Sequence, residues 1–139
     1  MAGVIYVADT SVYVLRDRHE QVRRRFDSLM LEGRLAACQM AALEFLNNAP
    51  DPASYRILTG VLEAQRWVNV TTAAMDRALH VHAALAKDGQ HRHFSLPDLI
   101  IAATAEVHSA TVLHYDADYD RIAAVTGQPT EWVAPRGSL

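Results

Sequence analysis

Cysteine and lysine are almost missing from this chain of 139 residues, in which Cys38 is the single cysteine and Lys87 the single lysine. One cysteine cannot form an internal disulfide, and it cannot build a thiolate cage around a metal. The fold must therefore depend on the burial of apolar side chains. Low cysteine use is typical of a reducing compartment, so we expect a cytoplasmic protein.

Long apolar runs are missing as well. The longest stretch, Leu96 to Val107, is too short to span a bilayer and is interrupted by Pro97, Asp98 and Glu106. The N-terminal segment carries no basic lead-in and reaches Asp9 before a signal-peptide core could be completed. The sequence therefore predicts neither a membrane protein nor a secreted one.

The chain also lacks an excess of positive charge. The chain has 13 Lys+Arg and 16 Asp+Glu, a formal net charge of -3. A molecule with this charge has no strong positive field to draw in nucleic acid. Hydrophobic residues at 50% and charged residues at 21% are typical of a globular chain. At this length one hydrophobic core forms, so we expect a single domain.

Short apolar runs alternate with helical patterns along the chain. Strands are predicted at Val4–Ala8, Arg34–Cys38, Trp67–Val70, Thr111–Tyr115 and Glu131–Val133. Helices are predicted from Asp9-Thr10-Ser11 to Gly33, at Met40–Asn47, Ala53–Gln65, Ala73–Lys87 and Leu96–His108, and after the acidic turn Asp116–Asp120 up to Gly127. This alternation predicts a three-layer α/β/α fold around a short, mainly parallel sheet.

The pattern also predicts which large side chains are buried. Leu43 and Leu46 are expected to face inward from their helix. Trp67 and Trp132 fall in predicted strands, and we expect them to fill the core or a dimer seam rather than to stack on bases.

Carboxylates recur where the predicted strands end. Asp9 follows the first strand, and Asp116 and Asp118 follow the fourth. Asp98 lies in the first turn of a helix that enters the same layer, and Glu44 lies in an apolar helical stretch where a lone carboxylate is costly to bury. Ligands of parallel sheets bind outside the carboxyl ends of the strands, which is where these acids are expected.

Each acid taken alone has a structural explanation. These roles are a helix N-cap for Asp9, a capping box with Ser95 for Asp98, an exposed helix stripe for Glu44, and first-turn acids facing a helix dipole for Asp118 and Asp120. Asp116 is the hardest to explain in this way, because it lies at the strand exit before the helix begins.

Convergence of the acids favours a second interpretation. Four or five carboxylates at one edge repel one another, and bound cations relieve that repulsion. An oxygen-only cluster suits Mg²⁺ or Mn²⁺, which bridge to phosphate. Two such ions can activate a water and steady the leaving oxygen of an in-line displacement. The acids therefore predict nuclease chemistry.

Because the acid excess is concentrated in one cation-binding cleft, the net negative charge remains compatible with a phosphate substrate.

Four segments carry the motifs of a known family. They are Asp9-Thr10-Ser11 after a strand, the isolated helical Glu44, the segment LPDLIIAATA at 96–105, and the segment VLHYDADY at 112–119. Together they resemble the ordered acid motifs of a PIN domain. More narrowly they resemble a VapC-type toxin, the ribonuclease half of a bacterial toxin-antitoxin pair. The resemblance spans nearly the whole chain, so residues 1–139 are expected to form one PIN domain.

The resemblance implies roles for individual residues. Asp9, Asp98 and Asp116 would hold Mg²⁺, with Mn²⁺ as a substitute, while Glu44 and Asp118 would complete a second metal site or orient the attacking water. Ser11 would support Asp9 through a hydrogen bond. The water would attack an RNA phosphodiester in line and leave a 5′-phosphate and a 3′-hydroxyl, without a covalent intermediate.

Two positions differ from the family pattern. His114 stands where many relatives have Thr, and Tyr119 stands where Phe is usual. The aromatic exchange is a mild one. His114 either tunes the site or only packs beside it.

The resemblance also implies partners. Such toxins form homodimers, cleave structured RNA such as transfer RNA or a ribosomal RNA loop, and are silenced by a cognate VapB-type antitoxin. The peptide segment of that antitoxin typically places a basic or bulky residue at the acids.

Arginines are the candidates for RNA contact. The densest basic region includes Arg16, Arg18 and Arg23, and Arg92 lies in the polar loop before Asp98. These side chains either grip phosphate beside the cleft or belong to solvated surface, where acids such as Asp17, Glu20 and Asp27 pair with the helical arginines.

Other metal motifs are not supported. The pairs His80/His82 and His91/His93 lack the cysteine or His-Glu-x-x-His context of zinc sites. The segment that begins at Asp116 lacks the Gly and Glu of a calcium loop, since Arg121 and Gly127 stand at those positions.

Two competing functions fit the same residues less well. A phosphoryl-accepting receiver domain needs a lysine at the end of a late strand, whereas Lys87 ends a predicted helix. A dehalogenase-type phosphatase needs its Asp-x-Asp motif after the first strand, and here the match is late. A catalytically silent PIN module remains an alternative, although all the expected acids are present.

Overall fold

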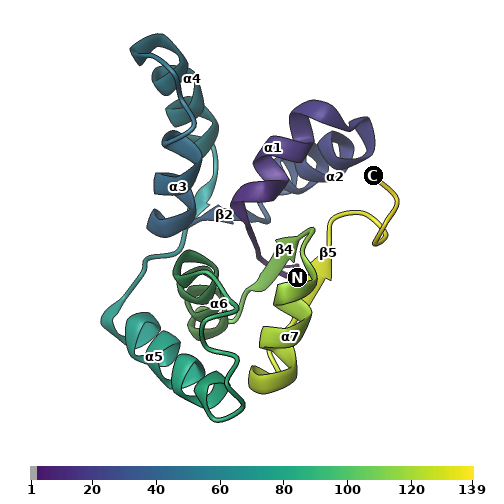
Figure 1. Ribbon diagram of the computed structural model, residues 1–139. Helices are drawn as coiled ribbons and strands as arrows, with labels where there is room; N and C mark the ends of the chain where they lie inside the picture. Colours follow the sequence, from purple (N-terminus) through teal and green to yellow (C-terminus); the bar gives the residue numbers. More distant parts are fainter. Residues whose placement is uncertain (1–2) are drawn as a thin grey trace.

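A five-stranded parallel sheet lies at the centre of the computed structural model, which describes residues 3–139 (Figure 1). Its strands are β1 (Tyr6–Ala8), β2 (Leu35–Ala37), β3 (Arg66–Trp67), β4 (Thr111–His114) and β5 (Thr130–Trp132). They lie in the order β3-β2-β1-β4-β5, and every neighbouring pair is parallel. The central strand is therefore β1, and β3 and β5 are the edge strands.

Helices cover both faces of this sheet. They are α1 (Thr10–Arg18), α2 (Glu20–Leu31), α3 (Gln39–Leu46), α4 (Pro52–Glu63), α5 (Thr72–Ala86), α6 (Leu96–Val107) and α7 (Ala117–Thr126). In Figure 1, α1 and α2 lie on one side of the strands, while α5, α6 and α7 lie on the other. None of the helices in residues 3–139 is long and apolar enough to cross a membrane.

Alternation along the buried strands separates two hydrophobic cores. Tyr6 and Ala8 of β1 pack into a core with side chains from α1 to α4, and Val7 between them packs into a core with α5, α6 and α7. Successive side chains of a strand point to opposite faces, so a continuous apolar run is what a sheet covered on both faces requires. The three-layer α/β/α architecture predicted from the sequence is confirmed.

The order of the strands sets the place of the site. From β1 the chain moves to β2 on one side, while β4 pairs with β1 on the other side. Such a switch point opens a crevice at the carboxyl ends of the two strands. Asp9 follows β1 directly, and Asp116 follows β4 after one intervening residue.

Several local predictions were wrong. The long first helix is two helices, because His19 adopts an extended conformation between α1 and α2. Leu43 points outward and is 61% exposed, although Leu46 is partly buried against the core. Trp67 is exposed on the two-residue strand β3, which contradicts the core position expected for it and leaves the dimer seam as a prediction. The acidic turn at 116–120 belongs largely to α7, which begins at Ala117.

Candidate metal centre

Three carboxylates from three different elements converge beyond the carboxyl end of β1. Asp9, Glu44 and Asp98 each offer an oxygen, and these oxygens all lie within 4.8 Å of one another. Asp9 lies between β1 and α1, Glu44 lies in α3, and Asp98 lies in the first turn of α6. Asp9 and Glu44 are 35 positions apart in the sequence, and Glu44 and Asp98 are 54 apart, so it is the fold that brings the three acids together.

Asp9 is buried and held from both sides. Its side chain caps α1 by accepting hydrogen bonds at Oδ2 from the Ser11 N–H at 3.3 Å and the Ser11 hydroxyl at 2.7 Å. The Tyr119 hydroxyl donates to Oδ1 at 2.7 Å. The N-cap role and the place in the acid group are therefore compatible, and the hydrogen bond expected from Ser11 is present.

Glu44 enters the group from the partly buried side of α3. Thr10 donates a hydrogen bond from Oγ1 to Oε1 of Glu44 at 3.0 Å. Burial raises the pKa of Glu44 above its ordinary value, the Thr10 hydrogen bond opposes this shift, and the charge of Asp9 adds to it. The apolar surroundings that the sequence suggested thus do act on this carboxyl group.

Asp98 lies at the N-terminus of α6, which begins after the cap residue Ser95. The Ser95 hydroxyl accepts a hydrogen bond from the Asp98 N–H at 3.2 Å, as the capping motif predicted. Burial raises the pKa of the Asp98 carboxyl to about 6, and the neighbouring charge of Asp9 contributes to the shift. This carboxyl group therefore takes up a proton more readily than an ordinary aspartate does.

Asp116 and Asp118 lie beside the three-acid group but are not members of it. Asp116 caps α7, and its Oδ1 accepts a hydrogen bond from the Asp118 N–H at 2.9 Å. Oδ1 of Asp118 lies 3.2 Å from Nε2 of His93, and the same nitrogen lies 2.7 Å from Nη1 of Arg121. These contacts connect the loop before α6 to the first turns of α7.

His114 is buried at the end of β4 and touches the site through the backbone. Its Nδ1 accepts a hydrogen bond from the Asp116 N–H at 3.1 Å, while Nε2 is buried without a hydrogen-bond partner among the described residues. Burial lowers the pKa of His114, which favours the neutral ring. The ring packs against Tyr119 and Trp132, with centroids 5.0 and 5.1 Å away. His114 therefore both packs beside the site and orients the chain at Asp116.

The candidate RNA-contacting arginines occupy different settings. Arg16 lies over the Phe26 ring at 4.7 Å, and its Nε is 3.9 Å from Asp27. Arg18, Arg23 and Arg92 are exposed. Arg16 is thus partly engaged within the fold, whereas the other three side chains face solvent.

Two contacts near the acids could not be read from the sequence. The Thr10 hydroxyl and the Tyr119 hydroxyl reach carboxylates that are far away along the chain. Thr10 follows Asp9 directly, but nothing in its position indicates a contact with Glu44. Tyr119 differs from the usual Phe only by its hydroxyl, and that hydroxyl contacts the acid group.

The donor set fits a hard divalent cation. It consists of carboxylate oxygens alone, and within residues 3–139 no histidine or cysteine joins a group of three. Mg²⁺ and Mn²⁺ prefer such oxygen ligands and retain several waters. A second hydrogen-bonded layer is present as well, since Ser11, Thr10 and Tyr119 each donate to these acids.

Comparison with known proteins agrees with this architecture. The PIN domain family matches residues 6–125. Ribonuclease VapC21 of Mycobacterium tuberculosis is 42% identical over 134 residues, which cover 96% of each chain. Ribonuclease VapC18 of the same species is 37% identical over 138 residues, which cover 98% of this chain and 100% of that protein. The DNA-bound VapBC of Salmonella typhimurium has the same fold, with a TM-score of 0.77 at 19% identity over 95% of this chain and 100% of that one. The chain therefore belongs to the PIN-domain family, among the VapC ribonucleases.

Proposed function

We propose that this protein is the endoribonuclease toxin of a toxin-antitoxin pair and that it hydrolyses phosphodiester bonds in RNA with the help of a divalent cation. The observation that carries the proposal is the convergence of Asp9, Glu44 and Asp98 within 4.8 Å at the carboxyl ends of the central strands. The relatives named ribonuclease support the substrate class. Membership of the PIN family does not favour a receiver-like signalling domain.

The acids would share the work of binding and positioning. Asp9, Glu44 and Asp98 would hold Mg²⁺, or Mn²⁺ in its place, with Asp116 and Asp118 as further ligands at the exit of β4. Bound there, the cation would supply positive charge for the scissile phosphate and lower the pKa of the attacking water. Glu44 would orient the attacking water and accept its proton.

The activity is testable with the purified protein and total cellular RNA. Discrete cleavage is expected with Mg²⁺ and none is expected with EDTA. Asp9→Ala should lose cleavage, whereas Asp76→Ala, which changes an exposed acid of α5, should retain it. Cleavage that survives both EDTA and Asp9→Ala would contradict the proposal. Sequencing of the new 5′ ends would identify the RNA, for which we propose a structured transfer or ribosomal RNA.

An antitoxin partner is proposed for the groove between α2 and α4. Among the solved neighbours are a toxin-antitoxin complex from Klebsiella pneumoniae and VapBC-5 of Mycobacterium tuberculosis, a member of the VapBC family of toxin-antitoxin systems. This groove has a volume of about 560 Å³, and Leu31 and Ile57 on its walls are 90% and 68% exposed. Arg16 and Asp27 add charged groups to the lining. A mixed apolar and charged groove suits a peptide segment that binds and is later released.

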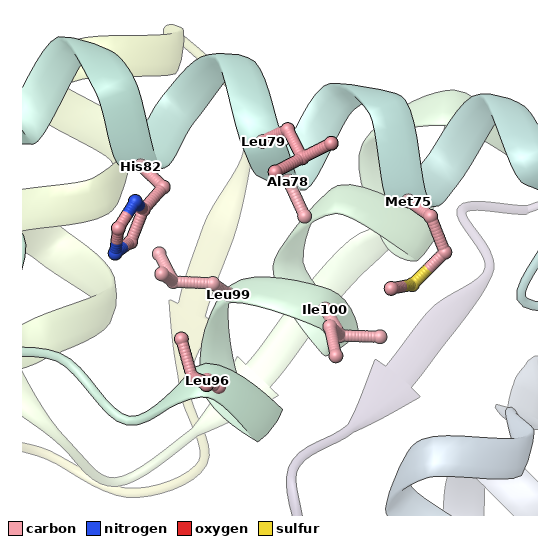
Figure 2. Close-up of a pocket in the computed structure, with 7 residues that line it drawn as sticks. All are labelled: Met75, Ala78, Leu79, His82, Leu96, Leu99 and Ile100. Atoms are coloured by element: carbon pink, nitrogen blue, oxygen red, sulfur yellow. The ribbon is translucent and has the colours of Figure 1, made fainter.

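A homodimer is proposed through the face formed by α5 and α6. Figure 2 shows Met75 of α5 directed toward Ile100 of α6, and these residues line an apolar cavity of about 230 Å³ together with Leu79 and Leu96. Among the seven lining residues His82 is the one with a polar side chain. Interfaces between identical subunits are more apolar than those of transient complexes, so this face suits a second copy of the chain. The face would place the two acid groups near the dimer interface, because Asp98 lies on the same turn of α6.

A further inference from the structure

Tyr119 is fully buried in α7, and its hydroxyl lies between two of the three converging acids. It donates a hydrogen bond to Oδ1 of Asp9 at 2.7 Å and lies 3.2 Å from Oδ1 of Asp98. Asp9 follows the central strand β1, and Asp98 belongs to α6 on one face of the sheet. The Tyr119 hydroxyl thus contacts two acids that are distant from each other in the sequence.

A phenol has one proton, so it cannot donate fully to both carboxylates at once. The shorter contact assigns the proton mainly to Asp9, while Asp98 lies within reach of the same O–H. Burial and the charges of Asp9 and Asp98 raise the pKa of Tyr119 well above its ordinary value, so the phenol stays a donor. A donor between two like charges reduces their repulsion and keeps them at a defined spacing.

The ring of Tyr119 is fixed by its neighbours. His114 packs on it with centroids 5.0 Å apart and planes inclined by 31°. The Tyr119 N–H bonds to the Asp116 carbonyl at 3.1 Å, and the Asp116 N–H bonds to Nδ1 of His114. The ring is also part of the core beneath α6 and α7. The hydroxyl is therefore held at the acids and cannot turn toward solvent.

We propose that Tyr119 is a positioning residue that holds Asp9 and Asp98 at the spacing required to bind a divalent cation. This inference rests on the proposed cation-dependent function. Tyr119 acts on the carboxylates through its hydroxyl, while their remaining lone pairs stay available to the cation. Ser11 holds the opposite oxygen of Asp9, so the carboxylate is fixed at both ends before a cation arrives.

The test is the binding of Mn²⁺ to the EDTA-treated and dialysed full-length chain, measured by calorimetry. Tyr119→Phe removes only the hydroxyl, and about tenfold weaker Mn²⁺ binding is expected from the loss of a hydrogen bond to metal ligands. Tyr13→Phe is the matched control. Its hydroxyl is equally buried but donates to Gln65 at 3.0 Å, away from the acids, so Mn²⁺ binding should not change.

The kinetic readout separates positioning from catalysis. In Tyr119→Phe the Mg²⁺ concentration for half-maximal RNA cleavage should rise about tenfold, while the rate at saturating Mg²⁺ stays within a few-fold of that of the unmodified chain. Binding of Mn²⁺ by Tyr119→Phe that equals or exceeds that of the unmodified chain overturns the inference. If the unmodified chain binds Mn²⁺ but does not cleave RNA, the proposed function fails and the calorimetric comparison still decides the role of Tyr119.

A measurement on the unmodified chain covers the case in which Tyr119→Phe does not fold. Ring signals of ¹³C-labelled tyrosine, assigned through the backbone, would be followed by NMR during addition of Mg²⁺. The Tyr119 signal should shift and the Tyr13 signal should not. A Tyr119 signal that stays in place while Mg²⁺ binds contradicts the inference.

Discussion

The Thr10 hydroxyl donates a hydrogen bond to the Glu44 carboxylate over a distance of 3.0 Å. The contact joins the first residue of α1 to the middle of α3, and it reaches an acid whose pKa is raised by burial. A donor at this carboxylate favours its ionised form. Thr10 thus supports Glu44 in the way that Ser11 supports Asp9.

Thr10→Val is expected to lower kcat/KM for RNA cleavage about tenfold, because it replaces the hydroxyl by a methyl group of similar size and leaves Glu44 without its donor. Cleavage of total RNA under Mg²⁺ measures the effect. Thr59→Val is the control, since the Thr59 hydroxyl donates to the Tyr55 carbonyl within α4 and not to one of the acids. Equal rates for both variants would show that the hydrogen bond to Glu44 is not needed.

The raised pKa of Asp98 predicts that the stability of the metal-free protein changes with pH in an unusual direction. Its pKa is about 6 in the folded state and 3.8 in an ordinary carboxyl group, so the folded state binds the proton more tightly. Between these values the free energy of unfolding should therefore fall as the pH rises. Asp98→Asn should abolish this slope and stabilise the protein at pH 7 by roughly 1 kcal/mol after solvent screening, or about 3 °C in Tm.

Thermal melts in EDTA from pH 4 to pH 7 would measure that slope. Asp51→Asn is a contrasting control, because the hydrogen bonds that Asp51 accepts at the N-cap of α4 lower its pKa. Asp51 therefore contributes stability above its unfolded pKa that is lost as the pH falls, and its replacement should give no gain at pH 7. A melt of Asp98→Asn with the same slope as the unmodified chain would refute the assignment.

The fold was largely predictable because its strands follow a simple rule. Val7 lies between Tyr6 and Ala8, and the two sets of side chains serve different cores, so the run had to be apolar throughout. The failures have local causes. Leu43 is apolar and yet exposed at a surface that α3 does not bury, and periodicity alone does not say which stripe of a helix meets the core.

The set of acids was predictable from the sequence, but the hydroxyl groups that donate hydrogen bonds to them were not. Asp9 and Asp116 follow adjacent parallel strands, and strand exits are visible in a sequence. The Tyr119 hydroxyl reaches Asp9 across 110 residues, and that contact depends on how the fold brings the first turn of α7 to the residue that follows β1. A pattern of residue types indicates that an aromatic ring is needed there, but it does not show where the hydroxyl points.

Cation binding should stabilise the folded chain. A ligand at 100 times its Kd that binds only the folded state adds about 2.7 kcal/mol, which for a chain of this size corresponds to about 8 °C in Tm. Tm measured against Mg²⁺ and Mn²⁺ concentration should rise in this way, and EDTA should reverse it. Asp9→Asn should lose the response and Asp76→Asn should keep it. A rise of equal size in Asp9→Asn would place the cation elsewhere.

The proposed antitoxin site in the groove between α2 and α4 can be tested with variants of this chain. Leu31→Glu or Ile57→Glu introduces a charge at a highly exposed apolar position of the groove and should weaken binding of the cognate antitoxin tenfold or more. Val125→Glu is the control, since Val125 is an exposed apolar residue of α7 outside the groove. Surface plasmon resonance with immobilised antitoxin measures the change. Undiminished binding by both groove variants would exclude this surface.

The face formed by α5 and α6 predicts the oligomeric state. Leu79 is 67% exposed beside the apolar cavity, and a stable dimer needs about 800 Å² buried on each copy. Leu79→Glu puts a charge into that interface on both copies at once and should give a monomer by size-exclusion chromatography with light scattering. Leu31→Glu, on the α2–α4 groove, should remain a dimer. A dimer that persists in Leu79→Glu, or that is lost in Leu31→Glu instead, would move the interface away from α5 and α6.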